Sequence, residues 1–126
     1  PFSSFGPGLD HYPEVPYRII GVDINRDHLD QRIRQRYLEQ MEAGFLEEVR
    51  ELADHDLAHS AGQALGYKEL LAHVRGETSL EDALELAVRR TKRFARRQQR
   101  WFRRDPRVEW VQHHEIDALI NEISLQ

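Results

Sequence analysis

The segment Thr91–Arg103, with the sequence TKRFARRQQRWFR, is the most basic part of the chain and the part around which the fold is predicted to form. The slightly wider window of residues 89–104 contains nine of the 18 Lys and Arg residues and no Asp or Glu. The net charge of −4 therefore combines a block of +9 with a remainder of −13. Such a block can bind phosphate groups whatever the charge of the whole chain is.

The same segment has the periodicity of an amphipathic helix. At 100° per residue, nearly all Lys and Arg side chains fall on one side, and an arc of about 140° on the opposite side contains Leu80, Ala83, Leu84, Ala87, Val88, Phe94, Ala95, Trp101 and Phe102. Two polar residues, Thr91 and Gln98, fall at the centre of the apolar arc. A buried Gln needs partners for up to four hydrogen bonds, so a helix built only for packing would usually carry Leu there.

Two aromatic residues, Phe94 and Trp101, fall at the border of the apolar arc. Arg90 and Arg97 are predicted to lie beside them, which would place guanidinium groups next to aromatic faces. A core-facing helix with a solvated basic side would explain this pattern without any ligand. Solvated helices usually pair their cations with acids four residues away, however, and this block contains none. The absence of acids favours a polyanionic ligand.

Size and composition limit the class of protein. A chain of 126 residues with 40% hydrophobic residues can form one domain or part of a larger one. No apolar run reaches the length of a membrane span, and no signal peptide is recognised. The absence of cysteine excludes disulfides and thiolate metal sites and fits a cytoplasmic protein.

Local signals predict a mainly helical chain. Residues 1–16 hold four of the five prolines and are predicted to be an irregular connector, followed by a folded part at residues 17–126. Tyr17–Ile24 is predicted to be a strand covered on both faces. Because one strand cannot form a sheet, the sequence leaves open whether its partners lie outside the chain, and Val108–Val111 is a second strand candidate. Helices are predicted at about residues 25–43, 45–55, 67–75, 79–104 and 114–125.

A turn before one of these helices is a second candidate for ligand contact. Gly66 has no Cβ and would let a ligand or another backbone approach closely. Tyr67 and Lys68 follow at a helix N-terminus, where anions can bind. The alternative is a helix-start glycine beside a packed Tyr. Arg32 and Arg36 lie one helical turn apart and could share an anion.

Motifs of self-contained catalysis are absent from the sequence. It has no GxxxxGK[ST] phosphate loop and no GxGxxG, HExxH or GxSxG motif. The seven His residues are scattered and predict no metal site. The residues therefore indicate contact with phosphates and unstacked bases rather than a complete active site.

Three segments together resemble the tRNA dimethylallyltransferase (tRNA isopentenyltransferase) family. ALGYKEL at Ala64–Leu70 is similar to its GY[RK] segment, and the basic segment is similar to its T-R-x-x-A-K-R-Q-x-x-W-[FL]-R signature. Leu29–Leu52 resembles its helix pair with a central Gly, and the opening PFS resembles the segment after its inserted helical domain. Lys92 stands where the family usually has Arg, Arg96 where Lys is common, and Arg100 where a small polar residue is common.

The resemblance implies an enzyme that transfers a dimethylallyl group from dimethylallyl diphosphate to N6 of the adenosine on the 3′ side of the anticodon. It implies a piece of an α/β core similar to P-loop NTPases, with about five helices and one or two short strands. Residues 17–126 would be its C-terminal part, without the phosphate-binding loop and the Asp general base. The enzyme would be cytoplasmic and monomeric at full length, with Mg²⁺ held by ligands outside this chain, and the piece alone would be inactive.

The resemblance also implies roles for individual residues, none of them catalytic and none of them a metal ligand. Gln98 would face the flipped base, and Arg97 would contact a phosphate of tRNA or of the diphosphate. The residues implied to contact tRNA are Gln63, Ala64, Leu65, Gly66, Tyr67, Lys68, Arg96, Arg97, Gln98, Gln99, Arg100, Trp101, Phe102 and Arg103. Those implied to line the channel or contact the diphosphate are Arg36, Thr91, Arg97 and Gln98.

Two other classes of function stay open from the sequence. A non-catalytic basic RNA-binding module would bind RNA with steep salt dependence but without preference for an adenosine beside the anticodon. A structural or protein-interaction piece would show no salt-sensitive RNA binding.

Overall fold

A computed structural model describes residues 11–55 and 59–125 of the chain. The chain divides into two compact units. Residues 26–96 form the helical unit, and residues 1–25 together with 97–126 form the strand unit. Of the predicted connector, residues 1–10 lie outside the described part, and residues 11–16 form neither helix nor strand.

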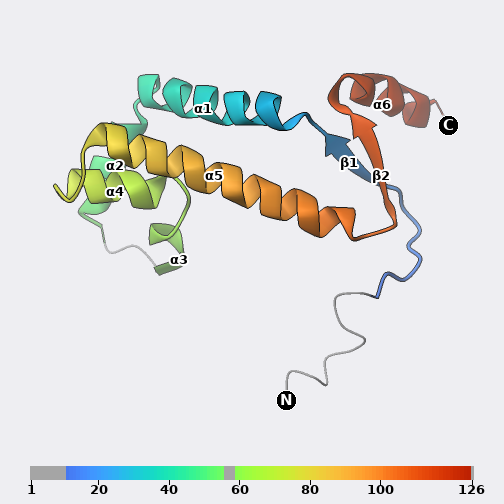
Figure 1. Ribbon diagram of the computed structural model, residues 1–126, viewed down its shortest axis with the longest axis horizontal. Helices are drawn as coiled ribbons and strands as arrows, with labels where there is room; N and C mark the ends of the chain where they lie inside the picture. Colours follow the sequence, from blue (N-terminus) through green and yellow to red (C-terminus); the bar gives the residue numbers. More distant parts are fainter. Residues whose placement is uncertain (1–10, 56–58, 126) are drawn as a thin grey trace, which may run out of the picture. The chain divides into compact units, whose positions relative to one another are not determined.

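The helical unit contains α1 (Arg26–Glu42), α2 (Phe45–Ala53), α3 (His59–Gly62), α4 (Tyr67–Val74) and most of α5 (Leu80–Arg103) (Figure 1). The predicted break at Gly44 is confirmed, because this residue adopts a left-handed conformation with φ 97° that favours glycine. The predicted start of α5 is also confirmed, since the Ser79 hydroxyl accepts a hydrogen bond from the backbone N–H of Asp82 at 3.1 Å.

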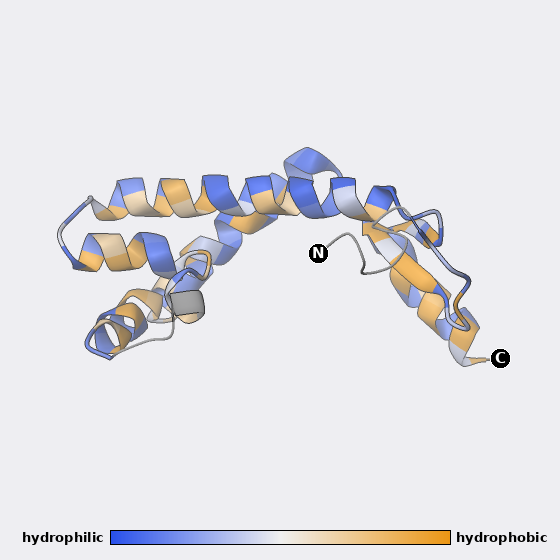
Figure 2. Ribbon diagram, turned by 90° about the horizontal axis from the view of Figure 1, so that it is seen from below, coloured by the Kyte–Doolittle hydropathy of each residue, from blue (hydrophilic) through white to orange (hydrophobic). Residues whose placement is uncertain are grey.

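Apolar side chains of this unit form two buried clusters. Hydropathy alternates along α5, which presents an apolar and a polar side (Figure 2). The larger cluster joins α2 and α4 to the start of α5, and the smaller one joins α1 to the middle of α5. The larger contains Leu46, Val49, Tyr67, Leu70, Leu71 and Ala83, and the smaller contains Ile33, Tyr37, Ala87 and Val88.

The strand unit is built on a two-stranded parallel sheet. Strands β1 (Ile19–Asp23) and β2 (Val108–Gln112) pair in register from Ile19 opposite Val108 to Asp23 opposite Gln112. A short 3₁₀ turn, η2 (His113–Glu115), follows β2 and leads into α6 (Ile116–Ser124). The last residues of α5 belong to this unit.

The first strand forms where it was predicted, but its pairing and its burial differ from the prediction. Its partner lies within the chain, because β2 pairs with it. Complete burial on both faces is not observed: no residue of β1 is fully buried, and Val22 is 42% exposed. Strand β1 thus has more apolar side-chain surface than the described residues bury.

The predicted fold class is confirmed. Within residues 11–55 and 59–125, five helices of eight or more residues accompany two short strands. Helix boundaries differ from the prediction by one or two residues, and the final helix begins as the 3₁₀ turn η2.

Candidate nucleic-acid interface

Within the helical unit, three cations of α5 have acidic partners on other helices. Arg90 Nη1 lies 2.7 Å from Oε1 of Glu69, at the start of α4. Arg96 Nη2 and Lys92 Nζ lie 3.0 Å and 3.6 Å from the same oxygen of Asp30 in α1. The acids that the basic block lacks are therefore supplied by other elements, which the sequence did not predict.

Within the strand unit, Arg103 is held at the end of α5 by both strands. Its Nη2 donates to Asp23 Oδ1 in β1 at 2.7 Å, and its guanidinium lies 4.5 Å from the ring centre of Trp110 in β2. Asp23 also accepts a hydrogen bond from the Gln112 amide at 3.3 Å. Arg103 was assigned to tRNA contact by resemblance, and its position here gives it a structural role as well.

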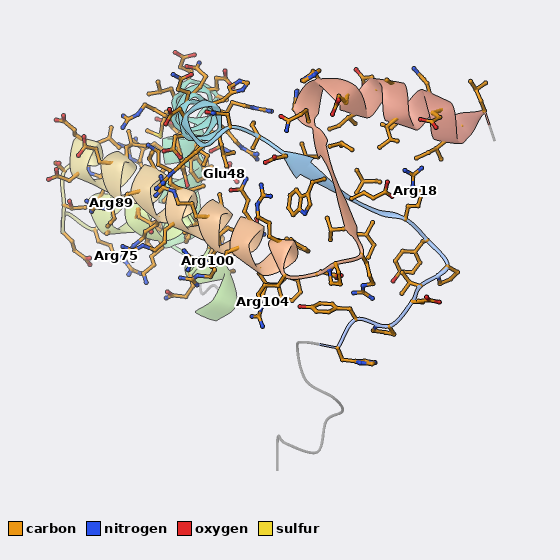
Figure 3. All side chains as sticks on the ribbon, turned by 45° about the vertical axis from the view of Figure 1, so that its right-hand side comes forward. Arg18, Glu48, Arg75, Arg89, Arg100 and Arg104 are labelled. Carbon is orange, nitrogen blue, oxygen red and sulfur yellow. The ribbon has the colours of Figure 1, made fainter. Side chains whose placement is uncertain are left out.

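Four other arginines of α5 are exposed and have no ion pair among the described residues: Arg89, Arg93, Arg97 and Arg100. The first two belong to the helical unit and the last two to the strand unit, and Figure 3 marks Arg89 and Arg100 on the helix. Their spacing of four, four and three residues keeps them within an arc of about 80° on one side of a helix. This unpaired side of α5 is available to phosphates.

The Gly66 turn is tightly built. Gly66 is buried and has φ 87°, and its N–H donates to Glu69 Oε2 at 2.8 Å. The backbone N–H of Lys68 donates to the carbonyl of Ala64 at 3.1 Å. These two N–H groups are used within the protein, so neither contributes to the anion contact that the sequence suggested at this helix start. The exposed side chain of Lys68 remains free for that contact.

Glu69 is a residue whose role sequence reasoning missed. Its side chain is 1% exposed, yet one oxygen accepts from Gly66 and the other pairs with Arg90. The spacing of three residues from Gly66 is that of a capping box and could have identified the first contact. The contact with Arg90 joins residues 21 positions apart and has no local signal.

Thr91 is engaged in contacts within the helical unit. Its hydroxyl donates to the Ala87 carbonyl at 2.9 Å and lies 2.8 Å from the Tyr37 hydroxyl. A threonine hydroxyl has one proton, so Tyr37 is the donor in the second bond. Burial raises the pKa of Tyr37. A diphosphate contact by Thr91 therefore rests on the resemblance alone.

Gln98 and the neighbouring aromatic residues Phe94 and Trp101 are exposed to solvent. The expectation of a buried amide is wrong, because Gln98 is exposed, as are Phe94 at 46% and Trp101 at 52%. Trp101 packs edge-on against Phe102 with ring centres 5.0 Å apart. Among the described residues, the cation–π contact of α5 is made by Arg103, not by the arginines predicted to flank Phe94 and Trp101.

The other candidate residues divide between the two units. Arg36 is exposed on α1, and the segment from Gln63 to Leu65 is exposed before α4. These residues, Thr91 and Arg96 belong to the helical unit, whereas Arg97–Arg103 belong to the strand unit.

The described residues provide no metal site and no membrane span. No group of three or more His, Asp or Glu side chains gathers in a way that could bind a metal ion within residues 11–55 and 59–125. Over the same residues, the helices are too short or too polar to cross a bilayer.

Comparison with solved structures defines the class of protein. The chain superimposes on part of a tRNA isopentenylpyrophosphate transferase from Bacillus halodurans, with a TM-score of 0.77 and 32% identity over 86% of this chain and 39% of that one. A tRNA isopentenylpyrophosphate transferase from Staphylococcus epidermidis gives a TM-score of 0.78 and 27% identity over 90% of this chain and 40% of that one. The fold is thus that of one part of a prenyl-transferring enzyme.

The sequence identifies the family. The model of the IPP transferase family matches residues 1–105, and the chain belongs to this family. It is 43% identical over 127 residues to the tRNA dimethylallyltransferase of Nocardioides sp., covering 99% of this chain and 41% of the relative. It is 46% identical over 113 residues to that of Streptomyces coelicolor, covering 88% and 36%. The chain thus spans about two fifths of the length of these relatives.

Proposed function

We propose that this chain forms the tRNA-holding part of an enzyme that transfers a dimethylallyl group from dimethylallyl diphosphate to N6 of the adenosine on the 3′ side of the anticodon. The observation that carries the proposal is the unpaired cationic side of α5, with Gln98 and Trp101 exposed on the same helix, in a member of this family. The relatives named above are tRNA dimethylallyltransferases. The intact enzyme would act in the cytoplasm as a monomer.

Gln98 and Trp101 are suited to hold a base that has left its stack. They lie three residues apart on α5, so their side chains share one side of the helix. An exposed amide can donate to and accept from the edge of an extruded adenine, and an exposed indole can stack on a base. Gln98 is therefore assigned to the base edge and Trp101 to stacking.

Arg97 and Arg100 are assigned to phosphates. Neither has an acidic partner among the described residues, so binding a phosphate would break no existing ion pair. Arg96 differs, because a phosphate would compete with Asp30 for its guanidinium. Lys68 and the exposed residues before it would add contacts from the Gly66 turn, and Arg36 would contact the diphosphate.

The Mg²⁺ that the resemblance implies finds no suitable ligand set among the described residues. We therefore assign no step to the metal, and its ligands would lie outside this chain, as the resemblance implies.

The proposal is tested with a chimeric enzyme. The Nocardioides relative would carry this chain in place of its matching segment, and transfer of labelled dimethylallyl groups to tRNA would be measured. The chimera should be active, and Gln98→Ala should reduce turnover by about tenfold or more, because the base edge loses its hydrogen bonds. Glu48→Ala, at an exposed residue of α2, is the matched control. A folded but inactive chimera, or full turnover and full tRNA affinity in Gln98→Ala, would contradict the proposal.

The second candidate is a non-catalytic RNA-binding module, favoured by the absence of a catalytic constellation in the sequence. Filter binding of the 126-residue chain to an anticodon stem-loop separates the two. A module of this kind would bind equally well when the adenosine beside the anticodon is replaced by another base. The enzyme piece should bind the substituted stem-loop more weakly.

A further inference from the structure

The Gly66 turn is fixed by side chains from three helices. On one side, a Cβ placed on Gly66 would lie 3.0 Å from Cε1 and 3.1 Å from the hydroxyl of Tyr37 in α1. On the other side, the buried carboxylate of Glu69 accepts the Gly66 N–H at 2.8 Å. Tyr37 and Glu69 therefore restrict the backbone of Gly66.

Both contacts continue into the basic segment of α5. The second oxygen of Glu69 lies 2.7 Å from Arg90, and the hydroxyl of Tyr37 lies 2.8 Å from Thr91. Two successive residues of α5 thus hold the turn: Arg90 acts through Glu69, and Thr91 acts through Tyr37. The acceptor oxygens of Glu69 are needed for the first route, since an apolar side chain of the same shape would offer no acceptor to either donor.

Tyr67 and Lys68 begin α4 and lie within the four-residue turn, here called the loop, that the Gly66–Glu69 bond closes. Tyr67 is buried in the core, whereas Lys68 is exposed and directed by the backbone of this loop. A cation whose backbone is already fixed loses less conformational entropy when it binds a phosphate. Loosening the loop should therefore weaken binding without removing any group that touches RNA.

We propose that Glu69 is a positioning residue that sets the RNA affinity of Lys68 by fixing the Gly66 turn against Arg90. The inference rests on the proposed function in taking RNA as the ligand. Glu69 itself, at 1% side-chain exposure, does not contact RNA. Its role differs from that of a residue that only stabilises the fold, because its effect on binding should depend on Lys68.

A double-mutant cycle on the 126-residue chain tests this dependence. The probe is an anticodon stem-loop RNA, and the variants are Glu69→Ala, Lys68→Ala and both together, with circular dichroism as the check on folding. Glu69→Ala should weaken binding about tenfold when Lys68 is present and less than about twofold when Lys68 is Ala. Equal losses in the two backgrounds would overturn the proposal, as would full affinity in a folded Glu69→Ala variant.

Glu69→Gln keeps the size of the side chain and replaces Glu69→Ala in the double-mutant cycle if the Ala variant does not fold. Its amide offers one acceptor oxygen, so it satisfies either Gly66 or Arg90 but not both. It should weaken binding by a smaller factor than Ala, again only when Lys68 is present. Glu48→Ala is the matched control for loss of one negative charge in the same unit and should leave binding unchanged.

Amide hydrogen exchange gives a readout that needs no RNA. The Gly66 N–H should exchange faster in Glu69→Ala, whereas the Gly44 N–H, which donates to the Met41 carbonyl at 3.2 Å, should be unaffected. Unchanged exchange at Gly66 would overturn the positioning role. A chain that shows this change at Gly66 but binds no RNA would contradict the proposed function and leave the turn geometry intact.

Discussion

Buried polar side chains in the helical unit differ in how well they are satisfied. Glu69 uses both oxygens, and Tyr37 donates to Thr91. The hydroxyl of Tyr67 is also buried, but it has no hydrogen-bond partner among the described residues. A buried hydroxyl without a partner costs about 1–3 kcal/mol, so this difference has a measurable consequence.

We expect Tyr67→Phe to leave the free energy of unfolding unchanged or to raise it by about 1 kcal/mol, because it removes an unsatisfied hydroxyl and keeps the packed ring. Tyr37→Phe is the matched control and should lower stability by about 1 kcal/mol, because it breaks the bond to Thr91. Urea unfolding followed by circular dichroism measures both. Equal losses in the two variants would show that the Tyr67 hydroxyl has a partner after all.

At the scale of elements, a close contact between the strands places Trp110 against Arg103, the last residue of α5. The ring of Trp110 lies against Gly21 of β1, and Arg103 lies on the ring. A Cβ on Gly21 would come within 2.7 Å of Val108 Cγ1 and 2.8 Å of the Trp110 ring, which is closer than atoms can pack. Gly21 is therefore needed for the Trp110 position that Arg103 uses.

We predict that Gly21→Ala destabilises the strand unit by about 1–3 kcal/mol through overpacking and displaces Trp110. The near-ultraviolet circular dichroism and fluorescence of tryptophan should change. Gly62→Ala is the control, because a Cβ there meets no atom within 4 Å. A Gly21→Ala variant with wild-type stability and spectra would show that the strands can separate enough to accept the methyl group.

At the scale of the whole molecule, charge is divided between internal ion pairs and cations without partners. The chain carries a net charge of −4, which would repel RNA at long range. Under the proposed function, RNA binding would therefore depend on local contacts by the unpaired arginines of α5. Each phosphate contact releases counterions, so the slope of log K against log salt concentration is proportional to the number of these contacts.

The double variant Arg97→Ala, Arg100→Ala should reduce the magnitude of the slope of log K against log salt concentration by about 2, because two phosphates would no longer be neutralised by the protein. Filter binding of the stem-loop RNA at several salt concentrations provides the slope. Arg18→Ala is the control in the same unit, because Arg18 is occupied by two hydrogen bonds of 2.8 Å to Glu109. A double variant with the wild-type slope would remove these arginines from the interface.

The helices and their starts could be predicted from sequence because the signals are local. Gly44, Ser79 and the apolar periodicity of α5 act within a few residues, and all three predictions were confirmed. The pairing of β1 with β2 could not be predicted, because the helical unit separates the two strands in the sequence. Parallel strands are not joined by a tight turn, so no hairpin motif in the sequence indicates that they pair.

The candidate site was predicted only in part for the same reason. The basic block and the Gly66 turn were recognised from residue types and spacing, whereas the burial of Gln98 was predicted wrongly. Periodicity indicates which side of a helix is apolar, but whether that side is covered depends on neighbouring elements, and Gln98 lies exposed beyond the two buried clusters.

The sequence by itself determined the helical character, the basic segment and the resemblance to the family, all of which depend on neighbouring residues or on motifs read along the chain. Only the tertiary structure decided which cations are available. Lys92 and Arg96 meet Asp30, Arg90 meets Glu69, and Arg103 meets Asp23, across separations that no local pattern encodes. An ion pair depends on distance in space, and folding alone brings these charges within a few ångströms of each other.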